Sequence, residues 1–170
     1  MSIAVIAHSG KTLGGGLGEL RTILEEAGYP KPLWYEVVKS RQVPDCARQA
    51  VADGADVIFV WGGDGSVQQC IDTVADSGAT IAILPAGTAN LLAKNLGIPQ
   101  DLKEAVKIGL HGERKYLDTG TVNGEHFAVM AGAGIDARMI RDTSSGLKAH
   151  IGRVTYFWSG AKNLKDRPLS

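Results

Sequence analysis

The residues most able to do chemistry lie in a glycine-rich turn that follows a buried apolar run, Val57–Trp61. The turn consists of Gly62, Gly63, Asp64 and Gly65. A strand, a glycine turn and the start of a helix together offer backbone N–H groups and a positive helix end to a phosphate. The glycines matter because a Cβ would keep the backbone away from the phosphate oxygens. This turn therefore predicts a phosphate site.

The carboxylate of Asp64 needs a separate explanation, because a negative charge repels phosphate. We expect Asp64 to act through a metal ion, a metal-bound water or a sugar hydroxyl. A structural alternative stays open at this point. The same residues fit a tight turn between a strand and a helix in which Asp64 is a helix cap.

Two further apolar runs, Ile3–Ala7 and Thr80–Leu84, also end in small or polar residues. Those residues are Ser9, Lys11, Thr88 and Asn90. Ligands of open α/β sheets bind at the carboxyl ends of the strands, so we expect these residues to lie near the glycine turn. Lys11 would supply a point charge for phosphate, and Thr88 and Asn90 would supply neutral hydrogen bonds.

Several other site classes find no support in the sequence. The Walker A pattern is absent, and Gly63-Asp64-Gly65 continues as Ser66-Val67, so the third glycine of G-x-G-x-x-G is also missing. Cys46 and Cys70 form no C-x-x-C pair, so we expect neither a zinc site nor a disulfide framework. These patterns argue against a P-loop ATPase and a Rossmann dehydrogenase.

The elements that must hold these residues alternate along the first two-thirds of the chain. The predicted strands are Ile3–Ala7, Leu33–Val38, Val57–Trp61 and Thr80–Leu84, and their continuous apolar character suggests a largely parallel, doubly covered sheet. Helical periodicity fills the gaps between them, with Pro44 in a first turn and Asp101 as an N-cap. We predict an α/β fold with a layered Rossmann-like domain at residues 1–110.

A different pattern begins near residue 111. Two runs, Tyr116–Val122 and Glu125–Ala131, flank Asn123-Gly124, which is a strong hairpin signal. A helix is predicted at 147–165. We interpret residues 111–170 as the opening part of a β-rich second domain, with one hairpin and one helix. One hairpin and one helix form too small a core to be stable alone. We therefore expect a homo-oligomer formed through residues 112–170.

Composition adds limits on location and partners. The 170 residues carry 18 basic and 18 acidic side chains, and no apolar run approaches the roughly 20 residues of a spanning helix. No secretory signal is visible, so a cytoplasmic location is expected. The excess of basic residues after Arg138 is usually a solvated helix face, with weak contact to an anionic inner membrane surface as the alternative. Aromatic residues do not interleave with these charges, so no nucleic-acid partner is expected.

Three segments together resemble the diacylglycerol kinase catalytic-domain family, which includes bacterial lipid kinases and sphingosine kinases and is related to NAD kinases. They are VIFVWGGDGSV, IAILPAGTANLLAKNLGIP and YLDTGTVNGEHF. The resemblance implies ATP and Mg²⁺ as cofactors and a lipid hydroxyl, of a diacylglycerol or a sphingoid lipid, as acceptor. It implies that Gly62, Gly63, Asp64 and Gly65 contact the nucleotide phosphates.

Other positions carry over from the same family motifs. Thr88 and Asn90 would lie near the nucleotide, Ser9 and Lys11 match the family's N-terminal turn, and Asp118 would join Asp64 in a network of carboxylates and waters around magnesium. The chain departs from the family at Leu91, where relatives often have Asp.

The resemblance leaves the activity of the 170-residue chain open. Bacterial relatives run to about 300 residues, and their candidate general base lies in the second domain, so Asp64 is the alternative within this chain. We therefore expect a lipid kinase that is truncated and inactive as a 170-residue chain. The alternatives are a non-catalytic module that binds nucleotide or oligomerises, and an NAD kinase.

Overall fold

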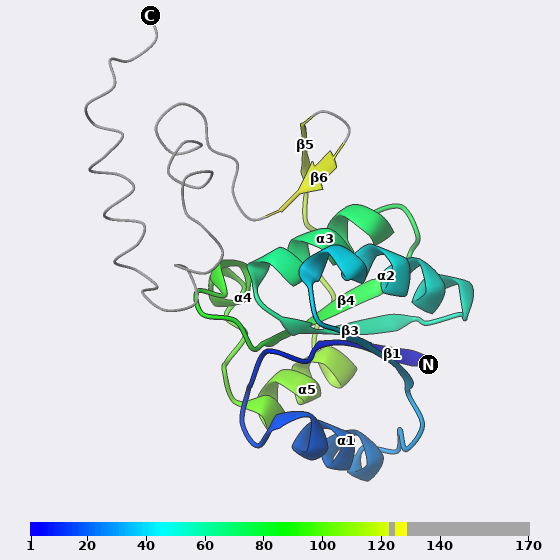
Figure 1. The fold of residues 1–170 in the computed structure, drawn as a ribbon, viewed down its shortest axis with the longest axis vertical. Coiled ribbons are helices and arrows are strands. Elements are labelled where there is room, and N and C mark those ends of the chain that lie inside the picture. The colour runs from blue at the N-terminus through cyan, green and yellow to red at the C-terminus, as the bar shows by residue number, and fades with distance from the viewer. Residues whose placement is uncertain (123–124, 129–170) are drawn as a thin grey trace, which may run out of the picture. The chain divides into compact units, whose positions relative to one another are not determined.

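Four parallel strands form the central sheet of this protein, in the order β2-β1-β3-β4 (Figure 1). The computed structural model describes residues 1–122 and 125–128. The strands are β1 (Ile3–His8), β2 (Leu33–Val37), β3 (Val57–Gly62) and β4 (Thr80–Pro85). Each coincides with a predicted strand to within one residue at either end, so the predicted α/β class and parallel sheet are confirmed.

Helices cover both faces of the sheet, as the continuous apolar strands require. In Figure 1, α1 (Gly16–Glu26) and α5 (Leu102–His111) lie on one face, and α2 (Val43–Ala52) and α3 (Asp64–Val74) lie on the other. A short helix α4 (Leu91–Asn95) follows β4, and a 3₁₀ turn η1 (Ser40–Gln42) precedes α2. Two predicted helix starts are confirmed: a proline occupies the first turn of α2, and Asp101 caps α5 by accepting from Glu104 N at 2.9 Å.

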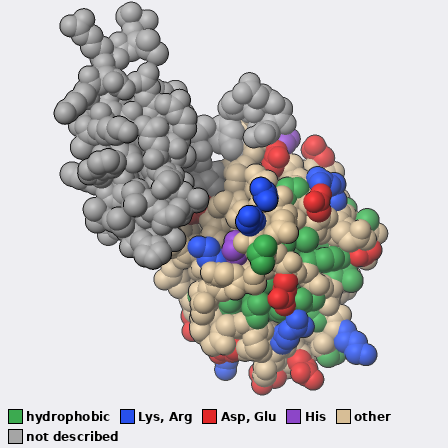
Figure 2. Space-filling model, viewed as in Figure 1, with side chains coloured by type: hydrophobic (Ala, Val, Ile, Leu, Met, Phe, Trp, Pro, Cys, Tyr) green, Lys and Arg blue, Asp and Glu red, His purple; other side chains and the backbone are tan. Residues whose placement is uncertain are grey.

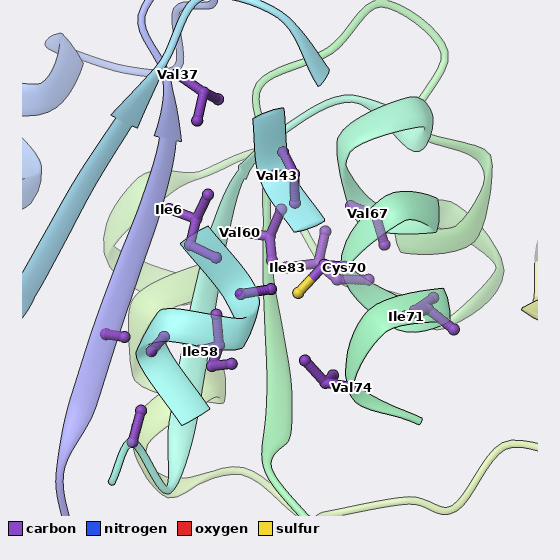
Figure 3. Packing of buried hydrophobic residues seen from close by; sticks show 14 of the residues in the cluster. Ile6, Val37, Val43, Ile58, Val60, Val67, Cys70, Ile71, Val74 and Ile83 are labelled. Carbon is purple, nitrogen blue, oxygen red and sulfur yellow. The ribbon is translucent and has the colours of Figure 1, made fainter. Parts of the chain in front are cut away.

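Alternate residues of each strand build two separate cores, because side chains along a strand point to opposite faces. On β1, Ile6 packs with Val43 of α2 and Cys70 of α3, and the cluster around them is drawn in Figure 3. Val5 points to the other face, toward the core that α1 and α5 close. Burial raises the pKa of the Cys70 thiol to about 12, so Cys70 behaves as a small apolar core residue.

The predicted hairpin is present, and its first strand begins later than expected, while residues 129–131 of the second predicted strand lie outside the described residues. Its strands are β5 (Gly120–Val122) and β6 (Glu125–Phe127), which pair antiparallel, whereas the sequence suggested Tyr116–Val122 and Glu125–Ala131. The described residues all belong to one unit, Met1–Val129. The predicted helix at 147–165 lies outside the described residues, and the division at residues 110 and 111 stays a prediction.

The hairpin is joined to α3 by side chains of that helix. Asp72 Oδ1 accepts from His126 N at 2.6 Å, and Gln68 Oε1 accepts from Ala128 N at 3.3 Å. Gln68 also donates through Nε2 to His126 O. Backbone groups at a strand edge need partners, and here helix side chains supply them.

Gln68 and its neighbour Gln69 allow a matched test of this contact. Both are half-buried on α3, but only Gln68 has a side-chain hydrogen bond to the hairpin among the residues that the structure describes. We expect Gln68→Ala to speed hydrogen exchange at the Ala128 amide by about fivefold, because its acceptor is lost. Gln69→Ala should leave that exchange rate unchanged. Equal exchange rates in the two variants would show that Gln68 does not hold the hairpin.

Basic and acidic side chains are interspersed on the face drawn in Figure 2. Elsewhere in the described residues, exposed charges form pairs, such as Lys107 with Glu104 at 3.7 Å on α5. Pairs of this kind contribute at most about 1 kcal/mol each, so they are surface features and do not determine the fold. Within residues 1–122 and 125–128, none of the helices is long and apolar enough to cross a membrane.

Candidate nucleotide site at the carboxyl ends of the strands

The strand order places a topological switch point between two neighbouring strands of the sheet. After β1 the chain turns toward β2, and after β3 it turns toward β4, on the opposite side. The connections therefore diverge between the carboxyl ends of β1 and β3. Open α/β sheets bind ligands at such a switch point. The segments following His8 and Gly62 flank it.

The glycine turn begins on the last residue of β3. Gly62 is buried, Gly63 is extended (φ −100°, ψ −175°), and Asp64 is the first residue of α3. A Cβ on Gly62 would lie 2.7 Å from Ser66 Cβ, so only glycine fits there. The first N–H groups of a helix have no partner within the helix, and those of Asp64 and Gly65 have no acceptor among the described residues. The turn therefore has the donors that an anion needs.

A second loop, the one after β4, packs directly on this turn. A Cβ built on Gly87 would lie 2.3 Å from Gly63 Cα, and one built on Gly63 would lie 3.2 Å from Gly87 Cα. The two backbones thus approach each other more closely than any side chain would allow. The structure brings together the glycine turn and the 85–90 segment, as expected from their place at neighbouring strand ends.

Asp64 connects the glycine turn to α4, the helix that follows the second loop. Its Oδ1 accepts from the backbone N of Leu92 at 3.2 Å, so it caps α4 rather than its own helix. The sequence left open that Asp64 is a helix cap. Asp64 does cap a helix, although that helix is α4 and not α3, which Asp64 begins. A carboxylate has a second oxygen, so this bond does not use up the group. Within the described residues, no cluster of three or more His, Cys, Asp or Glu side chains is poised around a metal.

Thr88 and Asn90 differ in their surroundings although they lie in the same loop. Thr88 is exposed, whereas Asn90 is only 3% exposed and adopts a left-handed backbone conformation. The Asn90 amide makes its hydrogen bonds to the backbone of its own loop. Thr88 is thus the more accessible of the two predicted nucleotide contacts.

The loop after β1 is held by the two strands beside β1. Ser9 donates to Val37 O of β2 through both N (2.9 Å) and Oγ (3.3 Å). Trp61 of β3 donates from Nε1 to Lys11 O at 3.1 Å. Trp61 is fully buried, so it packs under the site rather than lining it. Both Ser9 and Lys11 therefore lie at the carboxyl edge that carries the glycine turn, with their backbone positions fixed.

His8 ends β1 with a neutral ring. Its Nδ1 accepts from Gly10 N at 3.2 Å, which requires an unprotonated nitrogen, and burial and the charge of Lys11 both lower the pKa of the imidazole.

The lowered pKa of His8 predicts how the free energy of unfolding depends on pH. A His whose pKa is lower in the folded state contributes stability that is fully present above its ordinary value of 6.5 and is lost as the pH falls below it. We expect the free energy of unfolding to fall more steeply between pH 7 and 5 in the wild type than in His8→Gln, measured by urea unfolding. Parallel curves would show that the His8 proton is not linked to folding.

Ser40 reaches the site without having been identified from the sequence. Ser40 of η1 lies with its Oγ 3.2 Å from Oγ of the buried Ser66, and a Cβ on Gly65 would lie 3.8 Å from Ser40 Oγ. Ser40 follows the run Leu33–Val38, so the rule applied to the other strand ends would have found it.

Asp118 lies in the segment that leads into the hairpin. It is exposed and precedes β5 by one residue, Thr119, whose Oγ1 lies 3.0 Å from His126 Nδ1. Among the described residues, no hydrogen bond joins Asp118 to Asp64. The partnership of these two carboxylates stays a prediction.

Comparison with known proteins supports the resemblance to the diacylglycerol kinase catalytic-domain family. Residues 3–122 match the family model of the diacylglycerol kinase catalytic domain. A diacylglycerol kinase of Bacillus subtilis is 30% identical over 151 residues, which cover 87% of this chain and 50% of the relative. A Yersinia pestis protein named as a YegS-like lipid kinase is 32% identical over 136 residues, or 77% of this chain and 45% of the relative.

Solved structures agree with these relatives. A diacylglycerol kinase of Bacillus anthracis matches with a TM-score of 0.64 and 27% identity over 74% of this chain and 49% of that one. A second chain from the same organism gives a TM-score of 0.70 and 27% identity over 95% of this chain and 56% of that one. The chain spans about half the length of the curated relatives that it matches. On the extent of the family match, this chain belongs to the diacylglycerol kinase catalytic-domain family.

Proposed function

We propose that this protein provides the nucleotide site of an ATP-dependent lipid kinase, which transfers the γ-phosphate to a lipid hydroxyl. The observation that carries the proposal is the backbone contact between Gly63 and Gly87, which unites two glycine loops at the carboxyl edge of the sheet. Family membership supports the lipid kinase class. Diacylglycerol is the acceptor named for the Bacillus subtilis relative, and we propose it or a sphingoid-like lipid here.

The described residues suit the nucleotide phosphates. The N–H groups of Asp64 and Gly65 would donate to phosphate oxygens at the start of α3, and the Lys11 ammonium would add a positive charge. Gly62 and Gly63 would allow the close approach, and Thr88 would supply a hydroxyl at the rim. The Ser9 hydroxyl, which donates to Val37 O, would turn from that carbonyl to donate to the nucleotide. Phosphoryl transfer needs mainly positioning and charge stabilisation from a protein, which such an arrangement offers.

Magnesium fits the donors present. Mg²⁺ is usually held by one or two carboxylates together with phosphates and waters, and Asp64 has one oxygen beyond the bond to Leu92 N. Asp64 would hold the ion, with Asp118 acting through water. When bound, the ion neutralises charge that develops on the phosphates. Asp64 is also the candidate within this chain for accepting the proton of the lipid hydroxyl.

The magnesium role can be separated from the structural role of Asp64. Asparagine keeps an oxygen that can accept from Leu92 N, so Asp64→Asn should fold normally while losing the negative charge. We expect Asp64→Asn and Asp118→Asn to weaken Mg·ATP binding by about tenfold and metal-free ATP binding much less. Calorimetric titrations with and without Mg²⁺ would measure the difference. Equal losses in both titrations would indicate a sugar contact or a structural role.

The transfer reaction needs its own test. The purified chain would be incubated with γ-labelled ATP, Mg²⁺ and each of three acceptors: diacylglycerol in mixed micelles, sphingosine, and NAD. Label in a lipid supports the proposal, and label in NAD would support the NAD kinase alternative. Binding of Mg·ATP without transfer to any acceptor would support the non-catalytic module.

Two partner proposals accompany the kinase proposal. We propose a homo-oligomer formed through residues 112–170 and weak contact with anionic membranes through the basic residues after Arg138, which lie outside the described residues. Light scattering at micromolar concentration tests the first, and sedimentation with phosphatidylserine vesicles tests the second. A monomer, or equal sedimentation with neutral vesicles, would contradict the respective proposal.

A further inference from the structure

We infer that Asn90 is a positioning residue, which sets the place of the phosphate-binding turn and does not itself contact the nucleotide. The inference rests on the proposed function, because it explains how that nucleotide site is built. It assigns to Asn90 a role different from the direct hydrogen bond that its position in the sequence suggests.

The backbone of Asn90 is the first indication. Its φ of 50° and ψ of 51° lie in the left-handed region, and it is the one residue other than glycine with positive φ among those described. Asparagine enters this region more readily than most residues because its short amide can bond to the nearby backbone. The side chain is almost fully buried, at 3% exposed. Such a conformation persists only where surrounding contacts hold it.

The hydrogen bonds of the Asn90 amide are the second indication. Nδ2 donates to Pro85 O at 2.9 Å and to Gly87 O at 2.9 Å, and Oδ1 accepts from Gly87 N at 3.0 Å. The partners fix the orientation of the amide, because carbonyls only accept and a backbone N–H only donates. An amide has two N–H donors, so neither is left for a phosphate oxygen. Both donors of the group are used in closing its own loop.

The consequence reaches the phosphate-binding turn through Gly87. The Asn90 side chain forms hydrogen bonds with both the N–H and the C=O of Gly87. Gly87 in turn lies against Gly63, with no room for a Cβ between them. A second connection runs parallel to the first, because Asn90 O accepts from Lys94 N at 3.0 Å and so starts α4, whose Leu92 N donates to Asp64. Both connections end on residues of the glycine turn. Asn90 therefore determines where the phosphate donors lie.

The variant Asn90→Gly tests this directly. Glycine keeps the left-handed backbone without strain and removes the whole amide. We expect affinity for Mg·ATP to fall by about tenfold or more, since the phosphate donors lose their fixed place. Affinity for adenosine, followed by NMR titration, should change by less than about twofold, because adenosine has no phosphate. Asn95→Gly, at an exposed asparagine of the same loop–helix segment, is the matched control and should bind both ligands as the wild type does.

A double-mutant cycle with Gly87→Ala tests whether Asn90 and Gly87 act through one connection. A Cβ on Gly87 would lie 2.3 Å from Gly63 Cα and 2.5 Å from Asn90 Oδ1, so it disturbs the same connection at both ends. Gly87→Ala should therefore mimic Asn90→Gly, and the two losses should not add. Should Asn90→Gly fail to fold, Asn90→Asp replaces it, since it keeps the acceptor for Gly87 N. Additive losses, or equal losses for adenosine and Mg·ATP, would overturn the inference while leaving the proposed function intact. A wild type that binds no Mg·ATP would overturn the proposed function itself.

Discussion

Replacing Gly63 with aspartate is expected to abolish Mg·ATP binding, with a loss of affinity above about 100-fold. The new side chain places a negative charge beside the N–H groups proposed to hold the phosphates, where repulsion is poorly screened. Its Cβ would also lie 3.2 Å from Gly87 Cα, so the second loop has to yield. The extended backbone of Gly63 suits any residue, and the fold should survive. Isothermal titration calorimetry measures the affinity, and circular dichroism checks the fold.

A matched control comes from a glycine elsewhere on the molecule. Gly18 of α1 is exposed, and a Cβ there would meet nothing within 4 Å. Gly18→Asp makes the same chemical change and adds the same charge, and it should bind Mg·ATP as the wild type does. Unchanged affinity in Gly63→Asp would mean that the phosphates bind at another place. An equal loss in both variants would mean that net charge alone controls binding.

Replacing Trp61 with alanine is expected to have the largest effect on stability. Trp61 is among the largest fully buried side chains, and its Nε1 donates to Lys11 O at the site. Removing a buried Trp costs about 3–5 kcal/mol, which is a large part of the 5–15 kcal/mol that stabilises an ordinary domain. Urea unfolding followed by far-ultraviolet circular dichroism would measure the change in the free energy of unfolding.

Trp34 on β2 provides the comparison. It is half-buried, its Nε1 donates to Glu36 Oε1 at 2.7 Å, and Arg21 lies 3.6 Å above its ring. These contacts lie at the surface, so Trp34→Ala should cost about 1–2 kcal/mol. A loss for Trp61→Ala no greater than that for Trp34→Ala would contradict the placement of Trp61 at the centre of the core.

Much of the fold was predictable because short-range signals determine it. Continuous apolar runs gave the four strands, and Asp101 and the proline of α2 marked helix starts. The hairpin was predicted from Asn123-Gly124, but its first strand begins later than the apolar pattern suggested. A turn signal locates a hairpin, whereas the extent of pairing depends on what the strands can pack against, here the Gln68 and Asp72 side chains of α3.

The site was predictable in outline and not in detail. The rule that ligands bind at the carboxyl ends of strands selected three of the four loops, and it would have selected Ser40 had it been applied to β2. The contact between Gly63 and Gly87 and the bond from Leu92 N to Asp64 join residues more than 20 positions apart. No local pattern records such a pairing. The buried, self-bonded state of Asn90 likewise needs the folded loop to be seen.

The central claim is that nucleotide binds at the carboxyl ends of β1 and β3, and amide NMR of the ¹⁵N-labelled chain tests it most directly. Titration with Mg·ATP should shift the amide signals of Gly63, Asp64, Gly65 and Lys11 most, and those of Gly87 and Thr88 next. Residues at the opposite ends of the strands, such as Ile3 and Leu33, should keep their signals. Shifts confined to that opposite edge, or none at millimolar Mg·ATP, would contradict the account.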